Sequence, residues 1–414
     1  MFKLKTVIPF AVAALFAPMP SYAMDLVGSF IAAKEADPAY QASKSDQKAT
    51  TSQAISGRLS YLPNYMYTRQ QLPTLASPNL TQTVTQPIFN ATLAAQVAQG
   101  GPTMTLADST FQVKTIDLAQ RTLNAVNQIV LATEAIKANQ GQIDALESQA
   151  KGAQRKYELG QGTVTDLLDV QVKFEQAKAN DLTLRANLKG ARDQFAAITG
   201  QEAGANDFIL PHKHETFALE PLQSLLDKAD KENPSIVSAR ANESIAKYNI
   251  AKVSGQILPT VSYVLQKTNY NNVVSNNNGL AVSIPLDANS YADTYTAVAQ
   301  SQASSSTRLQ AETQTKVEVQ KLYALVEAGL ESLKIKWKAM DSARLSVTAN
   351  QKSYEAGVKS TTDVLIAIQT LYQTRNEYAQ AATSQASNFM NLLLVAAEEP
   401  EQVVQKTQLF LFRK

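Results

Sequence analysis

Tyr157-Glu-Leu-Gly-Gln-Gly-Thr-Val-Thr-Asp-Leu-Leu-Asp169 returns near the end of the chain as Tyr354-Glu-Ala-Gly-Val-Lys-Ser-Thr-Thr-Asp-Val-Leu-Ile366. Six residue types recur in the same register at an offset of about 197 positions, which indicates an internal duplication. Proline-containing sites repeat at nearly the same offset: Asp37-Pro38 with Asn233-Pro234, Leu62-Pro63 with Leu258-Pro259, and Gln86-Pro87-Ile88 with Ile284-Pro285-Leu286. The equal spacing predicts that one supersecondary unit is built twice.

The composition favours long helices over compact globules. Charged residues are 18% of the 414, and Gly and Pro number only 15 each. After the N-terminus no apolar run reaches the roughly 18 residues that a membrane-spanning helix needs. The absence of cysteine excludes disulfides, thiolate metal sites, cysteine nucleophiles and a lipid anchor on an N-terminal Cys.

The N-terminus is typical of an export signal. Lys3 and Lys5 precede an apolar run over 7–16, and Ser21-Tyr22-Ala23 supplies small residues at the cleavage positions. We therefore expect 1–23 to be a signal peptide. Its removal takes two lysines from a formal charge of +2, so the mature chain is close to neutral, which argues against a nucleic-acid partner.

Each half predicts the same order of elements. A helix is followed by a β-hairpin, a long helix of about 65 residues that would reach roughly 100 Å, a turn, and a return helix half as long. In the first repeat, 24–220, we place these at 25–57 (with Pro38 the only interior breaker), 59–89, 90–157, near 160, and 164–198. In the second repeat, 221–414, we place them at 221–255, 257–286 with a polar loop at 269–278, 288–354, near 357, and 364–396, before a C-terminal tail.

The arrangement of these elements follows from their lengths. Two shorter helices stacked end to end match one long helix, and the polar segment 200–220 would form a belt at mid-length. Strands of about 9 to 11 residues with one apolar face can cross a membrane only in a closed barrel, and four strands are too few for one. Several copies would have to contribute strands. Tyr61, Tyr65, Tyr67 and Tyr263 are then expected to form an aromatic girdle at the membrane boundary.

These features together resemble the TolC family of outer-membrane channels: the signal, the duplicated unit, the proline-containing strand ends and the paired Tyr-x-x-Gly-x-x-x-x-x-Asp turns. The resemblance implies a mainly α-helical homotrimer, with a twelve-stranded membrane β-barrel and a periplasmic α-helical barrel. It implies a location in the outer membrane, in contact with its lipid, and an exit duct for type I secretion, drug efflux or both. The partners would be a periplasmic adaptor and an inner-membrane pump, ABC-type or proton-driven, and no cofactor is implied. The missing Cys sets the chain apart from the lipid-anchored efflux branch, and Asp37-Pro38 resembles the type I secretion branch.

The residues after each turn allow two interpretations. Thr163-x-x-Asp166 and Ser360-x-x-Asp363 have the spacing of a capping box at a helix start. In the second interpretation, threefold symmetry brings Asp363, with Asp166 and Asp169, into carboxylate rings at the pore entrance. The two roles are compatible.

By resemblance, Tyr354 and Lys359 would tie neighbouring helices in the closed state. The sequence departs from the family at Ile366, where a second Asp is common, and at Lys359, where Arg is common. Lysine cannot form the bidentate fork of arginine, so a weaker or altered gate is expected, for which Asp169 could compensate.

The glycines of the two turns also have two interpretations. Gly160 and Gly357 suit a backbone with positive φ at a helix end. By resemblance, the tips Leu159-Gly160-Gln161 and Ala356-Gly357-Val358 would be where the adaptor docks. Both roles require a small residue, so the sequence does not separate them.

Other functions find less support in the sequence. His212 and His214 lack further ligand signals, so we expect no metal site, and Trp337 is assigned to helix packing. A hydrolase using Asp166 and Asp169 is disfavoured because both lie on one side of one helix start. No nucleophile–base pair or phosphate loop indicates an enzyme. The main alternative to a duct is a periplasmic adaptor protein, which also carries long helical hairpins.

Overall fold

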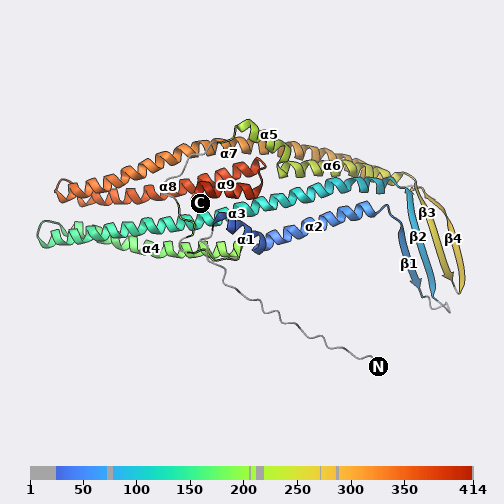
Figure 1. Cartoon of the computed structure of the whole chain (residues 1–414), viewed down its shortest axis with the longest axis horizontal. Coiled ribbons are helices and arrows are strands. Elements are labelled where there is room, and N and C mark those ends of the chain that lie inside the picture. The colour runs from blue at the N-terminus through green and yellow to red at the C-terminus, as the bar shows by residue number, and fades with distance from the viewer. Residues whose placement is uncertain are drawn as a thin grey trace, which may run out of the picture.

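The computed structural model describes residues 25–71, 78–204, 207–210, 219–270, 272–285 and 289–412. The expected signal peptide, His212, His214 and Leu286 lie outside these ranges. The described chain is elongated, with helices along most of its length and a small sheet at one end (Figure 1). Among these residues no helix combines the length and the apolar composition needed to cross a bilayer.

Two very long helices run the length of the helical part. These are α3, Ala91–Glu158 with 68 residues, and α7, Asn289–Glu355 with 67. Each is followed by a return helix, α4 (Val164–Thr199) or α8 (Thr361–Val395), packed antiparallel on it. The remaining length of each long helix is covered by α2 (Pro38–Leu59) or α6 (Pro234–Ser254) (Figure 1). The expected stacking of two shorter helices along one long helix is therefore confirmed.

The opening helix of each half is broken, so the expectation of single helices over 25–57 and 221–255 is wrong. Leu26–Ala36 forms α1 and Pro38–Leu59 forms α2; Leu222–Glu232 forms α5 and Pro234–Ser254 forms α6. A residue before proline avoids the helical region, and Asp37 and Asn233 have ψ angles of 116° and 124°. Each proline occupies the first turn of the next helix, where no N–H is needed.

The four strands form one antiparallel sheet in the order β1-β2-β3-β4. Their bounds are Asn64–Gln70, Asn79–Phe89, Thr260–Tyr270 and Val273–Ser283, and the short 3-10 helix Gly255–Ile257 precedes β3. The first strand thus begins five residues later than expected. The polar loop expected at 269–278 is wrong, because Asn276, Asn277 and Asn278 pair with β3 inside the ladder. The hairpin turns instead around Asn272, whose φ of 65° suits a two-residue turn.

The hydrophobic core lies at mid-length, where α1, α5 and α9 (Pro400–Phe412) pack against the long helices. The described part of the expected polar belt contributes apolar side chains to it. Phe208 contacts Phe195 and Phe412 with ring centroids 5.5 and 5.7 Å apart, and Leu210 is also buried. The belt is therefore at the expected place but not uniformly polar.

Candidate functional site

The two repeated turns have the same backbone geometry at the end of the molecule opposite the sheet (Figure 1). Gly160 N donates to Tyr157 O and Gln161 N to Lys156 O at 2.9 and 2.8 Å, and the second turn repeats both bonds. This pair of bonds is a Schellman motif, which needs a left-handed residue at its centre. Gly160 and Gly357 have φ angles of 70° and 76°, so the predicted positive φ is confirmed.

The tips of both turns are exposed and partly apolar. The exposed fractions are 65% for Leu159 and 78% for Val358. Gln161 and Ala356 are also exposed, and an added Cβ on either turn glycine would meet no atom within 4 Å. The described residues of this chain therefore leave both tips accessible to another molecule.

The return helices begin with side-chain caps. Thr163 Oγ1 accepts a hydrogen bond from Asp166 N, and Ser360 Oγ accepts one from Asp363 N. In the second turn the Asp363 carboxylate also accepts from Ser360 N at 3.0 Å, which completes a capping box. In the first turn Asp166 accepts from the Thr163 hydroxyl instead, so the box is formed only in the second repeat.

The carboxylate of Asp363 is held by donors from its own turn. The hydrogen bond from the Ser360 backbone N–H is the largest cause that lowers its pKa, followed by the Ser360 hydroxyl. Lys359 Nζ lies 3.5 Å from Asp363 Oδ1, so in the single chain this lysine contacts its own helix start. Asp166 is half-buried and Asp169 is exposed beside it.

The matching tyrosines of the two turns have different surroundings. Tyr157 is 46% exposed, whereas Tyr354 is 8% exposed and packs against Val364 and Ile368. The ammonium of Lys156, from α3, lies 3.6 Å from the ring centroid of Tyr354. It also donates to the Tyr354 carbonyl oxygen at 3.4 Å.

Lys156 therefore connects the two halves of the chain at the turns, a role that sequence reasoning missed. The available signal was a difference between the repeats. Lys156 aligns with Ser353 at the offset that matches Tyr157 to Tyr354, so only the first turn carries a cation there.

Apolar and aromatic side chains are more numerous on one face of the sheet, where the row of Tyr67 also holds Gln82 and Lys267. The other face is richer in small polar side chains but includes Met66 and Val264. The register places Tyr65, Val84 and Leu265 in one row, and Tyr263 beside Leu280 in the row two residues on. Tyr67 lies on the same face, because alternate residues of a strand share a face. The opposite face carries Thr81, Thr83 and Thr85 of β2 with Ser262 and Gln266 of β3.

The placement of Tyr61 differs from expectation. It precedes β1, so it does not lie on one side of a strand with Tyr65 and Tyr67. Its hydroxyl accepts a hydrogen bond from Asn90 N at 3.3 Å, at the start of α3. Tyr61 thus lies at the junction of sheet and helix, because Pro63 separates it from the strand.

The described residues contain no group of His, Asp and Glu side chains that could hold a metal ion. His212 and His214, for which no metal site is expected, lie outside these residues.

Comparison with known proteins identifies the class of this molecule. The profile of the family described as outer membrane efflux protein matches residues 32–201 and 225–397, most of both halves. The chain belongs to this family. It is accordingly an outer-membrane export channel and not an enzyme, and the periplasmic adaptor alternative is not favoured.

Curated relatives of this efflux protein include secretion proteins. The alkaline protease secretion protein AprF of Pseudomonas aeruginosa is 25% identical over 397 residues, covering 87% of this chain and 82% of AprF. The outer membrane protein TolC of Escherichia coli is 25% identical, covering 77% and 68%. The proteases secretion protein PrtF of Dickeya chrysanthemi is 23% identical, covering 78% and 73%.

Solved structures share the fold of this efflux protein. The outer membrane protein VceC of Vibrio cholerae has a TM-score of 0.77 at 14% identity, covering 90% of this chain and 96% of VceC. CusC has a TM-score of 0.78 at 13% identity, covering 91% and 92%.

Proposed function

We propose that three copies of this efflux protein assemble into one duct, in which each contributes four strands to a twelve-stranded barrel. The observation that carries the proposal is the open sheet: β1 and β4 are its edges, and one face presents exposed apolar side chains. An open sheet edge is not stable in lipid, because unpaired backbone groups there find no water. Pairing of β4 with β1 of the next copy removes both edges.

The apolar face then contacts lipid, and the threonine-rich face lines the lumen. Tyr65, Tyr67 and Tyr263 lie on the lipid side at a membrane boundary, as proposed from their register. Tyr61 would mark the level at which the sheet meets the helices. The long helices continue the wall as a helical barrel of roughly 100 Å.

The turns form the periplasmic entrance in this proposal. Threefold symmetry would bring Asp363, Asp166 and Asp169 into rings that favour cations. Tyr354, with Lys156 over its ring, would hold the two helical hairpins of one subunit together in the closed state. Lys359 would help to keep the carboxylate of Asp363 charged. The ring of Asp363 side chains would then stay negative.

The exposed tips 159–161 and 356–358 are proposed as the docking points of a periplasmic adaptor, itself driven by an inner-membrane pump. The names of AprF and PrtF favour protein secretion as the transport route, with efflux of small compounds as a second use. We further propose that residues 1–23 are removed on export, and that 24–220 and 221–414 are the two structural repeats.

The test is single-channel conductance of the purified protein in a planar bilayer, combined with its native mass. Discrete, cation-selective conductance from a trimer is expected. A variant with Leu265→Lys, a charge at mid-strand on the apolar face of β3, should lower insertion, because a lysine facing lipid is costly there. Val264→Lys, the neighbouring residue on the opposite face, is the matched control. A non-conducting monomer or dimer would contradict the duct.

A further inference from the structure

A cavity of about 520 Å³ is lined by residues of α3, α7 and α8 and by Ile209 and Leu210. Its lining residue Tyr372 also packs against the cluster of Tyr354, Val364 and Ile368, although none of the residues proposed for the gate or the docking tips lines the cavity. Its volume is in the range of sites that bind small organic ligands.

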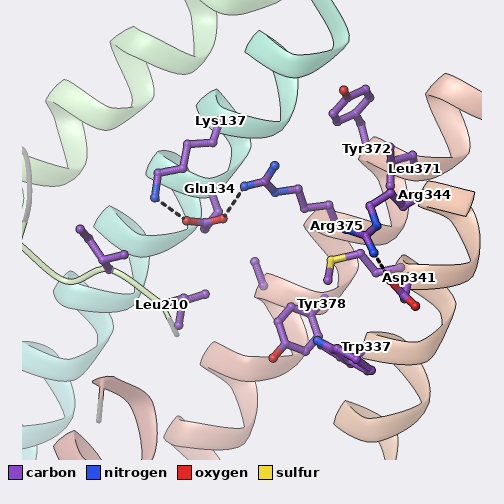
Figure 2. A pocket seen from close by; sticks show the side chains of 13 residues that line it. Glu134, Lys137, Leu210, Trp337, Asp341, Arg344, Leu371, Tyr372, Arg375 and Tyr378 are labelled. Carbon is purple, nitrogen blue, oxygen red and sulfur yellow. Dashed lines mark hydrogen bonds and ion pairs between the residues drawn. The ribbon is translucent and has the colours of Figure 1, made fainter. Parts of the chain in front are cut away.

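One wall of this cavity is aromatic and apolar. Trp337 of α7 lies beside Tyr378 of α8, and Leu210 faces them from the other side (Figure 2). Met340 of α7 also lines the cavity. Tyr378 and Leu210 are buried, and Trp337 is half-buried. This wall offers flat contact area for an aromatic ring at a low cost in side-chain entropy.

Among the described residues that line the cavity, the charged groups have an excess of positive charge. Lys137, Arg344 and Arg375 are cationic, and Glu134 and Asp341 are anionic. Asp341 pairs with Arg344 at 2.9 Å, and Glu134 pairs with Lys137 at 2.8 Å. Both carboxylates therefore have a close cation, and Arg375 is the cation in excess.

Arg375 extends from α8 toward Glu134 (Figure 2). Among the described residues its one ion pair, Nη2 to Glu134 Oε2, is 3.5 Å long. A guanidinium carries five N–H donors in a planar fork that suits carboxylate and sulfonate groups. Most of its donor capacity is thus available beside an aromatic wall.

We propose that this cavity binds a small aromatic anion, with its ring against Trp337 and Tyr378 and its acidic group on Arg375. Glu134 opposes such a ligand, because its carboxylate lies next to the same guanidinium. The site would lie on the helical wall, next to the cluster that contains Tyr354.

The chain carries its own reporter, because Trp337 is its single tryptophan. It lies 48 residues after the start of α7, which places it roughly 70 Å from the sheet end at 1.5 Å per residue. Quenching of its emission by energy transfer therefore reports a probe in the cavity and not a probe dissolved in detergent around the sheet.

The experiment titrates the full, purified protein with anilinonaphthalene sulfonate and follows Trp337 emission. Phenylnaphthylamine, the same aromatic skeleton without the sulfonate, is the matched uncharged probe. The variants are Arg375→Gln, Glu134→Gln, and Arg185→Gln as a control arginine on α4 that pairs with Asp181.

We expect saturable quenching by the sulfonate and weaker binding of phenylnaphthylamine. Loss of a charge-assisted contact in Arg375→Gln should weaken binding about tenfold. Glu134→Gln should tighten it, and Arg185→Gln should leave it unchanged. The opposite signs matter, because general damage to the helices would weaken binding in both cavity variants.

The proposal is wrong if the wild-type protein shows no saturable quenching, or if both probes bind equally. It is also wrong if Arg375→Gln binds like the wild type, or if Glu134→Gln weakens binding.

Discussion

The ammonium of Lys156 lies 3.6 Å from the ring centroid of Tyr354, so the first half of the chain contacts the second at the turns. Tyr354 is buried in a cluster with Val364 and Ile368 of α8, against which Ala145 of α3 also packs. This cluster is therefore contacted by both helical hairpins. Separation of the hairpins would have to break this contact.

The first prediction concerns this contact in the proposed gate. Lys156→Met should raise resting conductance about two- to fivefold per subunit, since a cation–π contact contributes about 0.5–1 kcal/mol. Tyr354→Phe keeps the ring and should change little, whereas Tyr354→Leu should resemble Lys156→Met. Single-channel recording measures each. Lys151→Met, on the same helix but paired with Glu147, is the control. Equal conductance of Lys156→Met and wild type would remove Lys156 from the gate.

The second prediction concerns the proposed carboxylate ring. Asp363→Asn should lower cation selectivity while α8 still forms, because the Asn side chain can accept the hydrogen bond from Ser360 N. The pKa of Asp363 is lowered by that bond, so the carboxylate stays charged below the ordinary titration range of Asp. Wild-type selectivity should therefore persist as the pH falls toward about 4 and decline only below it.

Reversal potentials in a salt gradient, recorded against pH, measure this. Asp227→Asn, on α5 at mid-length of the molecule, is the control carboxylate. Selectivity that is the same in Asp363→Asn and wild type would place Asp363 away from the pore.

The third prediction concerns the break between α1 and α2. Asp37 is buried, accepts from Tyr40 N at 2.7 Å and pairs with Arg121 at 2.7 Å. The hydrogen bond from Arg121 is the main cause that lowers the pKa of Asp37. Because the folded pKa lies below the unfolded value of about 3.9, the stabilisation is complete above that value and is lost as the pH falls through the folded pKa.

Asp37→Asn keeps the helix cap but removes the ion pair, as Asn233 shows by capping α6 in the second half. Its thermal midpoint should be below that of wild type at pH 7, and the difference should shrink below about pH 4. Asp37→Ala also loses the cap, at a further cost of about 1 kcal/mol. Circular dichroism of the helices measures both midpoints. A difference that grows on acidification would contradict the assignment.

The fourth prediction concerns the packing of α7 on α8. A Cβ on Gly329 would lie 1.8 Å from Gln385 Oε1, and Gln385 is buried with its Nε2 donating to Val326 O at 2.8 Å. Gly329→Ala should destabilise the protein by about 1–3 kcal/mol, because an overfilled contact forces side chains or backbone to move. Gly329→Ala with Gln385→Ala has room again and should recover part of the loss. Failure of the double variant to recover would show that the contact with Gln385 is not what opposes a side chain at position 329.

Sequence reasoning predicted the elements that are marked by local signals, such as turn glycines and helix caps. The turn glycines at 160 and 357, the caps at Thr163 and Ser360 and the two long helices all follow from residues within one turn of each other. The break at Asp37 was missed because proline was treated as tolerable inside a helix, although the helical region is disfavoured for the residue before it. The Asn276–Asn278 run was assigned to a loop by its polarity, but strand pairing across the hairpin overrode that preference.

The candidate site was only partly accessible for a different reason. Tyr157 and Tyr354 align in the repeats, yet one is exposed and the other buried, because α8 and Lys156 pack on only one of them. Such contacts depend on how two hairpins lie against each other. No local pattern around either tyrosine contains that information.

The last prediction separates the two roles of the turn glycines. Gly357 has a φ of 76°, and an added Cβ would meet no atom within 4 Å, so only backbone strain opposes a side chain in this chain. Asparagine tolerates the left-handed region better than alanine does. Gly357→Asn should therefore fold and conduct like the wild type, while Gly357→Ala should cost about 1 kcal/mol at the turn.

If an adaptor docks closely at 356–358, Gly357→Asn should still lose export in cells, because the new side chain occupies the space of the partner. Secretion of cargo, compared with trimer amount and conductance of the same variant, measures the difference. Normal export by Gly357→Asn would leave the turn conformation as the whole reason for glycine at this position.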